Sequence, residues 1–336
     1  MIDRYSRQTL FSGIGEKGQK KLGNSYVVII GCGALGTIIA TCLVRAGVGK
    51  IRIIDRDFIE YHNLQRQVLF DEDDIKNQLP KAIAAERHLK KVNSSVEIEG
   101  IVADVNFTNI ERFVHDAHLI LDGLDNFETR FLINDVSLRH KIPWIYGAAI
   151  SSIGMTMNII PGETPCFRCF IADSPGKGTI HTCDTVGVIS PAPFIIGSLQ
   201  SVEAMKILVG AEDINRDLII IDVWNGTFDR PKIRFHKDCP ACQGKFEFLD
   251  GDYGLRATSI CGQDAVQVLN LEARTISLEG LASRLKPVGQ VTYNEFMLRF
   301  KVDDCEMVVF PDARAIIKNT NEESRARGLY AKYIGT

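Results

Sequence analysis

The segment from Tyr26 to Asp55 constrains the fold of this chain more than any other. It holds two short apolar runs, and between them lie a glycine-rich turn and a helix-like stretch. This order predicts a strand, a tight turn, a helix and a second strand. Such a unit binds phosphate at the helix N-terminus and ribose at an acid that ends the second strand. We therefore expect an α/β, Rossmann-like nucleotide-binding domain with a mixed, largely parallel sheet flanked by helices.

Each glycine of the turn has a steric role in such a unit. Gly31 permits the tight turn, Gly33 lets a phosphate approach the backbone, and Gly36 lets the helix and strand pack closely. Asp55 is placed to accept hydrogen bonds from ribose hydroxyls. Its alternative role is to cap the following turn, which Asp57 could also do.

The residues after the second strand distinguish two kinds of nucleotide chemistry. Asn63, Gln65 and Arg66 follow the acid, and Lys81 opens a predicted helix over 81–92. Hydride transfer has no need for cations here, whereas breaking a triphosphate requires them to neutralise the departing pyrophosphate. Arg66 and Lys81 are placed for that task, although either one alone would be interpreted as a solvated surface charge.

A third predicted strand, over 118–122, is followed by Asp125 and Asn126. Ligands bind at the carboxyl ends of parallel strands, so Asp125 is a candidate magnesium ligand. Alternatively it caps the predicted helix over 127–140. Further strands are expected over 96–102, 142–147 and 218–224, and further helices over 109–115 and 194–209.

Two Cys-x-x-Cys pairs predict a structural zinc site, because two such knuckles complete a tetrahedral set of thiolates. The four residues are Cys166, Cys169, Cys239 and Cys242. The alternative is a pair of redox-active sites, but neither pair lies at a strand-to-helix junction of the thioredoxin kind. Between the pairs, the stretch 172–182 is rich in Gly, Pro, Ser and Thr and predicts a mobile loop. Cys183 follows it and is either an attacking or sulfur-carrying thiol or an ordinary loop cysteine.

The bulk composition excludes several classes of protein. The 336 residues are 45% apolar and 24% charged with a formal net charge of −3, which does not suggest general binding to nucleic acid or anionic membrane. No apolar run approaches a membrane span and the N-terminus lacks a signal peptide, so we expect a cytoplasmic protein whose nine cysteines are not paired. Residues 1–25, in which Arg4 and Arg7 flank Tyr5, are expected to form a solvated arm, or else an arm that delivers a guanidinium group to a phosphate.

The pattern of apolar and polar residues changes after the second cysteine pair. Residues 244–254 predict a linker, and the remaining residues alternate weakly, as in a small α+β unit. Strands are expected over 265–269, 296–302, 306–310 and 313–317, and helices over 278–285 and 322–334. We therefore divide the chain into domains over 1–248 and 249–336. The second has no catalytic constellation and either docks a partner or covers the main domain.

As an ordered set, these motifs resemble those of the ThiF/MoeB/HesA adenylyltransferases, the bacterial relatives of ubiquitin-activating enzymes. The resemblance covers about residues 1–245. It rests on Arg4-Tyr-Ser-Arg-Gln8, Gly31 to Gly36, Asp55, Asn63-Leu-Gln-Arg-Gln67, Pro80-Lys81, Asp125-Asn126, the paired cysteines and Thr182-Cys183. One departure is Ala34, where some relatives have glycine. Alanine should be tolerated there unless φ is positive.

The resemblance implies an activity: the terminal carboxylate of a small ubiquitin-like sulfur carrier ending in Gly-Gly attacks the α-phosphate of ATP, giving an acyl-adenylate and pyrophosphate. It implies ribose contacts from Asp55 and Asn63, phosphate contacts from Arg66 and Lys81, and magnesium at Asp125. It further implies a homodimer in which Arg7 reaches the partner's triphosphate, a covalent role for Cys183, and a sulfur donor such as a cysteine desulfurase.

Several interpretations remain open at this point. The carrier is either ThiS-like, for thiamin synthesis, which the surroundings of Cys183 and the tail slightly favour, or MoaD-like, for molybdopterin synthesis. Related enzymes would activate a carboxylate on a peptide or on a modified tRNA base. From other classes, the glycine motif alone would also suit an NAD(P)-dependent oxidoreductase. A non-catalytic scaffold is disfavoured by the complete set of charged residues.

Overall fold

The computed structural model describes residues 4–172, 186–252, 258–259, 265–269, 275–302 and 304–335. The chain divides into two compact units, Met1–Tyr253 and Gly254–Thr336. Cys183 and the greater part of the predicted mobile loop lie outside the described residues.

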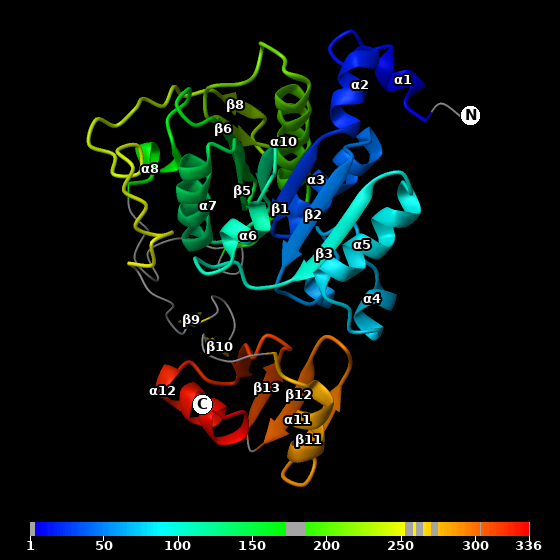
Figure 1. Cartoon of the computed structure of the whole chain (residues 1–336), viewed down its shortest axis with the longest axis vertical. Helices are drawn as coiled ribbons and strands as arrows, with labels where there is room; N and C mark the ends of the chain where they lie inside the picture. The colour runs from blue at the N-terminus through cyan, green and yellow to red at the C-terminus, as the bar shows by residue number, and fades with distance from the viewer. Residues whose placement is uncertain are drawn as a thin grey trace. The chain divides into compact units, whose positions relative to one another are not determined.

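The described part of the first unit is built on an eight-stranded sheet with the order β3-β2-β1-β4-β5-β6-β7-β8 (Figure 1). The strands are β1 (Tyr26–Ile30), β2 (Lys50–Asp55), β3 (Glu97–Val102), β4 (Leu119–Asp122), β5 (Trp144–Ile150), β6 (Ile153–Ile159), β7 (Ile219–Asp222) and β8 (Thr227–Asp229). Neighbours from β3 to β5 pair in parallel, while β6, β7 and β8 each pair antiparallel with the strand before. The predicted fold class, α/β with a mixed, largely parallel sheet, is confirmed.

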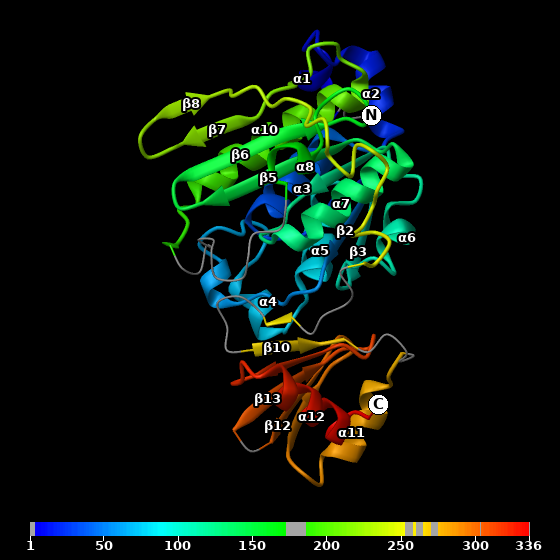
Figure 2. The same ribbon diagram turned by 90° about the vertical axis from the view of Figure 1, so that its left-hand side faces the viewer.

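Helices cover both faces of this sheet, which explains why its central strands are continuous apolar runs. On one face lie α2 (Gly15–Gly23), α3 (Ala34–Ala46), α5 (Lys81–Val92) and α10 (Pro191–Val209). On the other face lie α6 (Ile110–Val114), α7 (Phe127–His140) and α8 (Phe167–Phe170). Short helical segments complete the unit: α1 (Ser6–Thr9), α4 (Glu72–Lys76) and the 3₁₀ turn η1 (Tyr61–Asn63). Figure 2 shows α7 and α8 alongside β5 and β6.

Two sequence expectations about this unit were wrong. The described part of the N-terminal segment, residues 4–25, is not simply a solvated arm, because α2 packs against α10, with Leu22 buried and Gly18 placed against Val209. The linker expected over 244–254 is partly core, since Phe248 and Leu249 are buried. In both cases a polar, turn-rich segment carries a few apolar side chains that find their cover only in the tertiary structure.

The helix α10 has the length and hydropathy of a membrane-crossing helix, with 19 residues and a mean hydropathy of 1.3 in its most apolar window. The helix is not an uninterrupted apolar run, because it carries Gln200, Glu203 and Lys206. It packs against α3, β5 and β6. Its buried Glu203 accepts a hydrogen bond from Asn158 at 2.6 Å, and its buried Gln200 donates to the carbonyl of Asp122 at 2.9 Å. These polar contacts are those of a core helix.

The second unit is a small α+β fold, as predicted. Its described strands form one antiparallel sheet in the order β11-β12-β13-β14-β10-β9. They are β9 (Thr258–Ser259), β10 (Ala265–Val268), β11 (Gln290–Tyr293), β12 (Leu298–Val302), β13 (Cys305–Val309) and β14 (Ala315–Lys318). The helices α11 (Leu278–Leu285) and α12 (Glu323–Tyr333) share one apolar core with this sheet.

Candidate active site and metal centre

The candidate site lies where the strand order reverses, between β1 and β4, at their carboxyl ends. The turns after these strands touch: Gly31 has a φ of +91°, and a Cβ there would lie 2.6 Å from the carbonyl oxygen of Gly123. A Cβ on Gly36 would lie 2.1 Å from the carbonyl oxygen of Gly31. Gly33 differs, because a Cβ there would meet nothing closer than 3.8 Å. Packing therefore requires Gly31 and Gly36, while the open side of Gly33 suits an approaching ligand.

Asp55 ties the end of β2 to the glycine turn. One carboxylate oxygen accepts from the backbone N–H of Cys32 at 2.6 Å, and the other accepts from that of Asp57 at 2.7 Å. Burial raises the pKa of Asp55, and the neighbouring Lys81 opposes that rise. The carboxylate thus performs the capping role that the sequence left as an alternative. Each oxygen keeps a second lone pair for a ligand donor.

Lys81 is a buried cation fixed at the first residue of α5. Its Nζ lies 3.0 Å from a carboxylate oxygen of Asp57, and its backbone N–H donates to the Asp57 carbonyl at 2.9 Å. Burial opposes the charged form, but Asp57 and Asp55 outweigh it and raise the pKa of Lys81. The ammonium group therefore stays charged and positioned before any ligand arrives.

Asp125 is exposed near the end of the β4–α7 connection, directly before the helix cap Asn126. The cap of α7 is Asn126, whose side-chain oxygen accepts from the backbone N–H of Thr129 at 3.0 Å. The suggestion that Asp125 caps this helix was therefore wrong. The charge of Asp125 contributes to raising the pKa of Lys81, which places both side chains in one electrostatic neighbourhood.

The polar residues of the motif after β2 differ in how deeply they are buried. Asn63 is buried in η1, where its side-chain oxygen accepts from the N–H of Glu60 at 3.0 Å. Gln65 is exposed and donates to the carbonyl of Val188 at 3.3 Å. Arg66 is half-buried and its guanidinium donates to the carbonyl of His62 at 2.9 Å.

Two further charged features were missed by sequence reasoning. Arg56, directly after Asp55, forms an ion pair with Asp104 at 2.7 Å. Asp122, the last residue of β4, forms a buried pair with Arg130 of α7 at 2.8 Å. Arg130 also donates to the carbonyl of Leu124 at 2.6 Å, so it fixes the segment that carries Asp125. The available signal was a lone Asp in an apolar strand and a lone Arg on the buried side of a helix.

Arg7 lies far from this site within its own chain. The neighbouring Gln8 donates to the carbonyl of Ala46 at 2.9 Å, at the C-terminal end of α3, whereas the glycine turn adjoins Ala34 at the other end. A helix of 13 residues spans about 20 Å. Ala34 is itself helical and outside the positive-φ region, so alanine is tolerated there.

The four cysteines of the two pairs meet, as the zinc prediction requires. Their sulfur atoms all lie within 4.8 Å of one another, and four of the separations are 3.4, 3.5, 3.6 and 3.8 Å. Zinc–thiolate bonds of about 2.3 Å in a tetrahedron place sulfur atoms about 3.8 Å apart, so the set fits zinc. The residues around it attach the centre to α7: Asn134 accepts from the N–H of Phe167 at 2.8 Å, and Asp135 accepts from that of Phe248 at 3.0 Å.

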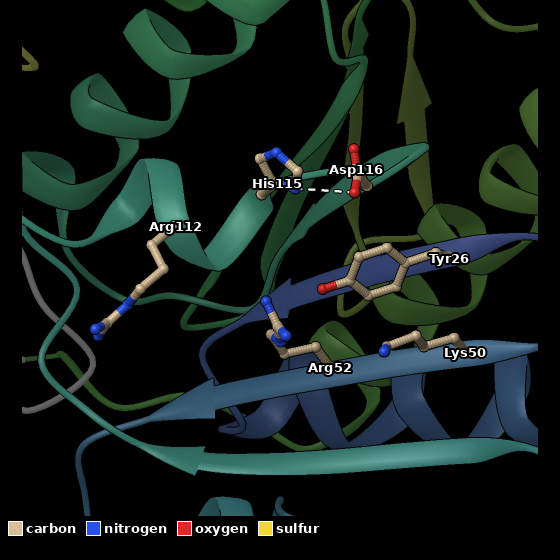
Figure 3. Close-up of a pocket in the computed structure, with 6 residues that line it drawn as sticks. All are labelled: Tyr26, Lys50, Arg52, Arg112, His115 and Asp116. Carbon is tan, nitrogen blue, oxygen red and sulfur yellow. Dashed lines mark ion pairs between the residues drawn. The ribbon is translucent and has the colours of Figure 1, made fainter.

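A separate hollow of about 600 Å³ lies at the opposite, amino-terminal ends of β1 and β2 (Figure 3). It is lined by Tyr26, Lys50, Arg52, Arg112, His115 and Asp116. Two of its cations have carboxylate partners: Lys50 pairs with Glu97 at 2.7 Å, and Arg52 pairs with Glu99 at 2.8 Å. Arg112 lies over the ring of Phe113.

Comparison with known proteins decides the family. The model of the ThiF family matches residues 5–241. The chain belongs to the ThiF family. The family match decides against the nicotinamide-dependent oxidoreductase that the glycine motif alone left open. It spans the glycine turn, the charged residues at the sheet edge and the first three cysteines of the metal centre.

This ThiF-family chain is 44% identical to the protein of Bacillus subtilis (strain 168) named sulfur carrier protein ThiS adenylyltransferase, over 100% of both chains. It is 36% identical to the SAMP-activating enzyme E1 of Haloferax volcanii, over 72% of this chain and 88% of that protein. Among solved structures it resembles E. coli MccB with ATP, at 25% identity and a TM-score of 0.63, over 72% of this chain and 75% of that one.

Proposed function

We propose that this ThiF-family enzyme adenylylates the C-terminal Gly-Gly carboxylate of a ThiS-like sulfur carrier. A carboxylate oxygen bonds to the α-phosphorus of ATP, the bond to the bridging oxygen breaks, and pyrophosphate leaves. The observation that carries the proposal is the full-length match to the Bacillus subtilis relative, which is named for this activity. It is supported by a site that holds a buried, charged Lys81 beside an open phosphate cradle at Gly33.

The charges of the site suit a reaction in which charge builds on a departing pyrophosphate. Lys81 is preorganised by Asp57, and Arg66 lies on the same connection as Asn63. We assign both cations to the phosphates, as in the sequence-based prediction. Asp55 and Asn63 are assigned to the ribose.

A magnesium ion would be held by Asp125, whose carboxylate is exposed at the sheet edge. It would supply charge neutralisation between the triphosphate and the surrounding acids. The cysteine centre leaves no open position for water, so we assign it a structural zinc ion.

Arg7 can serve the reaction only from a second subunit, given its place at the far end of α3. We therefore propose a homodimer in which each α1 supplies Arg7 to the partner's triphosphate. Cys183 is proposed to link covalently to the carrier during sulfur loading, with a cysteine desulfurase as sulfur donor. A Cys183→Ser variant that loads sulfur at the normal rate would contradict that role.

A MoaD-like carrier is the second candidate. The relevant observation is that Xenopus laevis MOCS3, named an adenylyltransferase and sulfurtransferase, is 35% identical over 73% of this chain. That match covers 73% of this chain and 54% of the Xenopus laevis protein, whereas the match to the Bacillus subtilis relative covers all of both chains. We assign catalysis to the first domain, whose boundary after residue 248 stays a prediction, and leave the second domain a docking or covering role.

The decisive experiment is ATP–pyrophosphate exchange with magnesium and purified carriers from the source organism. We expect exchange with the ThiS-like carrier and none with a matched carrier lacking its terminal glycine. Exchange with the MoaD-like carrier alone would select the second candidate. No exchange with either, from folded zinc-loaded protein, would refute carrier adenylylation.

A further inference from the structure

The side chain of Gln67 is buried, but its carbonyl oxygen has no hydrogen-bond partner within the described part of the chain. The residue is only 4% exposed. Its backbone is fixed at both ends: the N–H donates to Asn63 at 3.0 Å, and the carbonyl accepts from Phe70 at 3.2 Å. A buried acceptor left without a donor destabilises a protein, so such groups call for an explanation.

The amide of Gln67 borders the open side of the glycine turn. A Cβ on Gly33 would lie 3.8 Å from Nε2 of Gln67 and equally far from the carbonyl oxygen of Gly123. Gly33 is the N-cap of α3, and no side chain caps that helix end. The first N–H groups of α3 are therefore available to an anion, and an anion seated there lies beside the Gln67 amide.

Nucleotide chemistry accounts for both ends of this amide. A phosphate has only acceptors, so it would take a hydrogen bond from Nε2 on the Gly33 side. The adjoining ribose has hydroxyl donors, which would satisfy Oε1. Asp55 binds the N–H of Cys32 within the same turn, so the expected ribose position adjoins the expected phosphate position.

We propose that Gln67 is a nucleotide-binding residue whose amide bridges phosphate and ribose, with Nε2 donating to a phosphate oxygen and Oε1 accepting from a ribose hydroxyl. The identity of the ligand as ATP rests on the proposed function. The contact itself rests on the buried, unpaired oxygen and on the open face of Gly33.

The test compares Gln67→Met, which keeps the size of the side chain and removes both hydrogen bonds, with the unchanged protein. Binding of magnesium–ATP is measured by calorimetry, and thermal unfolding is followed with and without ATP. We expect binding to weaken about tenfold or more. The unfolding temperature without ATP should stay level or rise, because the variant loses only an unsatisfied oxygen, while the stabilisation by ATP should shrink.

The matched control is Gln267→Met, which replaces another buried glutamine, in β10 of the second unit. It should leave ATP binding unchanged. Equal ATP affinity in Gln67→Met and the unchanged protein would overturn the inference, as would a lower unfolding temperature with an unaltered response to ATP. Failure of the unchanged protein to bind ATP would instead overturn the proposed function.

A second measurement isolates the ribose contact. Affinities for ATP, 2′-deoxy-ATP and 3′-deoxy-ATP are compared in the unchanged protein and in Gln67→Met. Removing the hydroxyl that Oε1 binds should lower the affinity of the unchanged protein. The same removal should lower the affinity of Gln67→Met by a factor that is several-fold smaller. If both deoxy analogues lose the same factor in the two proteins, Oε1 does not contact the ribose, and the bridging role is wrong.

Discussion

The buried pair between Asp122 and Arg130 gives the sharpest quantitative prediction about the site's framework. Their side chains are 0% and 4% exposed, and Nε of Arg130 lies 2.8 Å from the carboxylate. Burial raises the pKa of Asp122, and Arg130 lowers it. Arg130→Met removes the partner and leaves a buried carboxylate uncompensated. Breaking such a pair costs about 3–5 kcal/mol.

Arg130 also bonds the carbonyls of Leu124 and Gly147, at 2.6 and 2.8 Å. The double variant Asp122→Asn, Arg130→Met loses these bonds as well, but it carries no buried charge. We therefore expect it to be at least about 1 kcal/mol more stable than Arg130→Met. In a unit of this size, the single variant should melt roughly 6–20 °C lower than the unchanged protein.

The assay is urea unfolding followed by fluorescence of the buried Trp144, with calorimetric melting as the second measure. Comparing Arg130→Met with the double variant separates the effect of the unpaired buried charge from that of the lost hydrogen bonds. The reasoning would be refuted if the free energy of unfolding fell by less than about 1 kcal/mol in Arg130→Met, or fell equally in the single and double variants. Either result would show that other groups stabilise the buried carboxylate of Asp122.

Four further predictions concern the turn, the cation, an acid and the metal centre. Gly36→Ala should unfold the nucleotide site, measured as lost ATP binding, because its Cβ would meet a backbone oxygen at 2.1 Å. Lys81→Met should lower the pyrophosphate-exchange rate about 10²–10³-fold, with Lys17→Met on the exposed side of α2 as its unaffected control. Burial raises the pKa of Asp135 to about 6, so folded protein holds this proton more tightly than unfolded protein. The stabilisation of the folded state by this tighter proton binding is complete below about pH 4 and disappears as pH rises through 6. Asp135→Asn should therefore remove up to about 3 kcal/mol of the pH dependence of the unfolding free energy, measured in urea titrations. Cys242→Ser should release zinc to a chelator faster and lower the melting temperature.

Each of these has a result that counts against it. Normal ATP binding by Gly36→Ala would mean that the turn can move. An exchange rate within tenfold of normal in Lys81→Met would assign charge neutralisation to other residues. An unchanged pH profile in Asp135→Asn would contradict burial as the cause of the pKa shift. Stoichiometric, chelator-resistant zinc in Cys242→Ser would remove that cysteine from the metal centre.

The sequence by itself determined the local units of the nucleotide site. The spacing of Gly31, Gly33 and Gly36 after an apolar run specifies a turn and a helix start, because steric limits on φ and on close packing act over a few residues. For the same reason the central strands and helices lie where periodicity predicted them. The pairing of Cys166 and Cys169 with Cys239 and Cys242 was also predictable, since zinc chemistry dictates a set of four.

Only the tertiary structure decided which distant residues meet. Sheet order brings Gly31 against Gly123, Asp122 against Arg130, and Gln67 to the open side of Gly33. It likewise covers α2 and Phe248, two features that look solvated in the sequence. Local periodicity carries no information about these contacts. They follow from burying apolar faces on both sides of one sheet, and that choice is made by the whole chain at once.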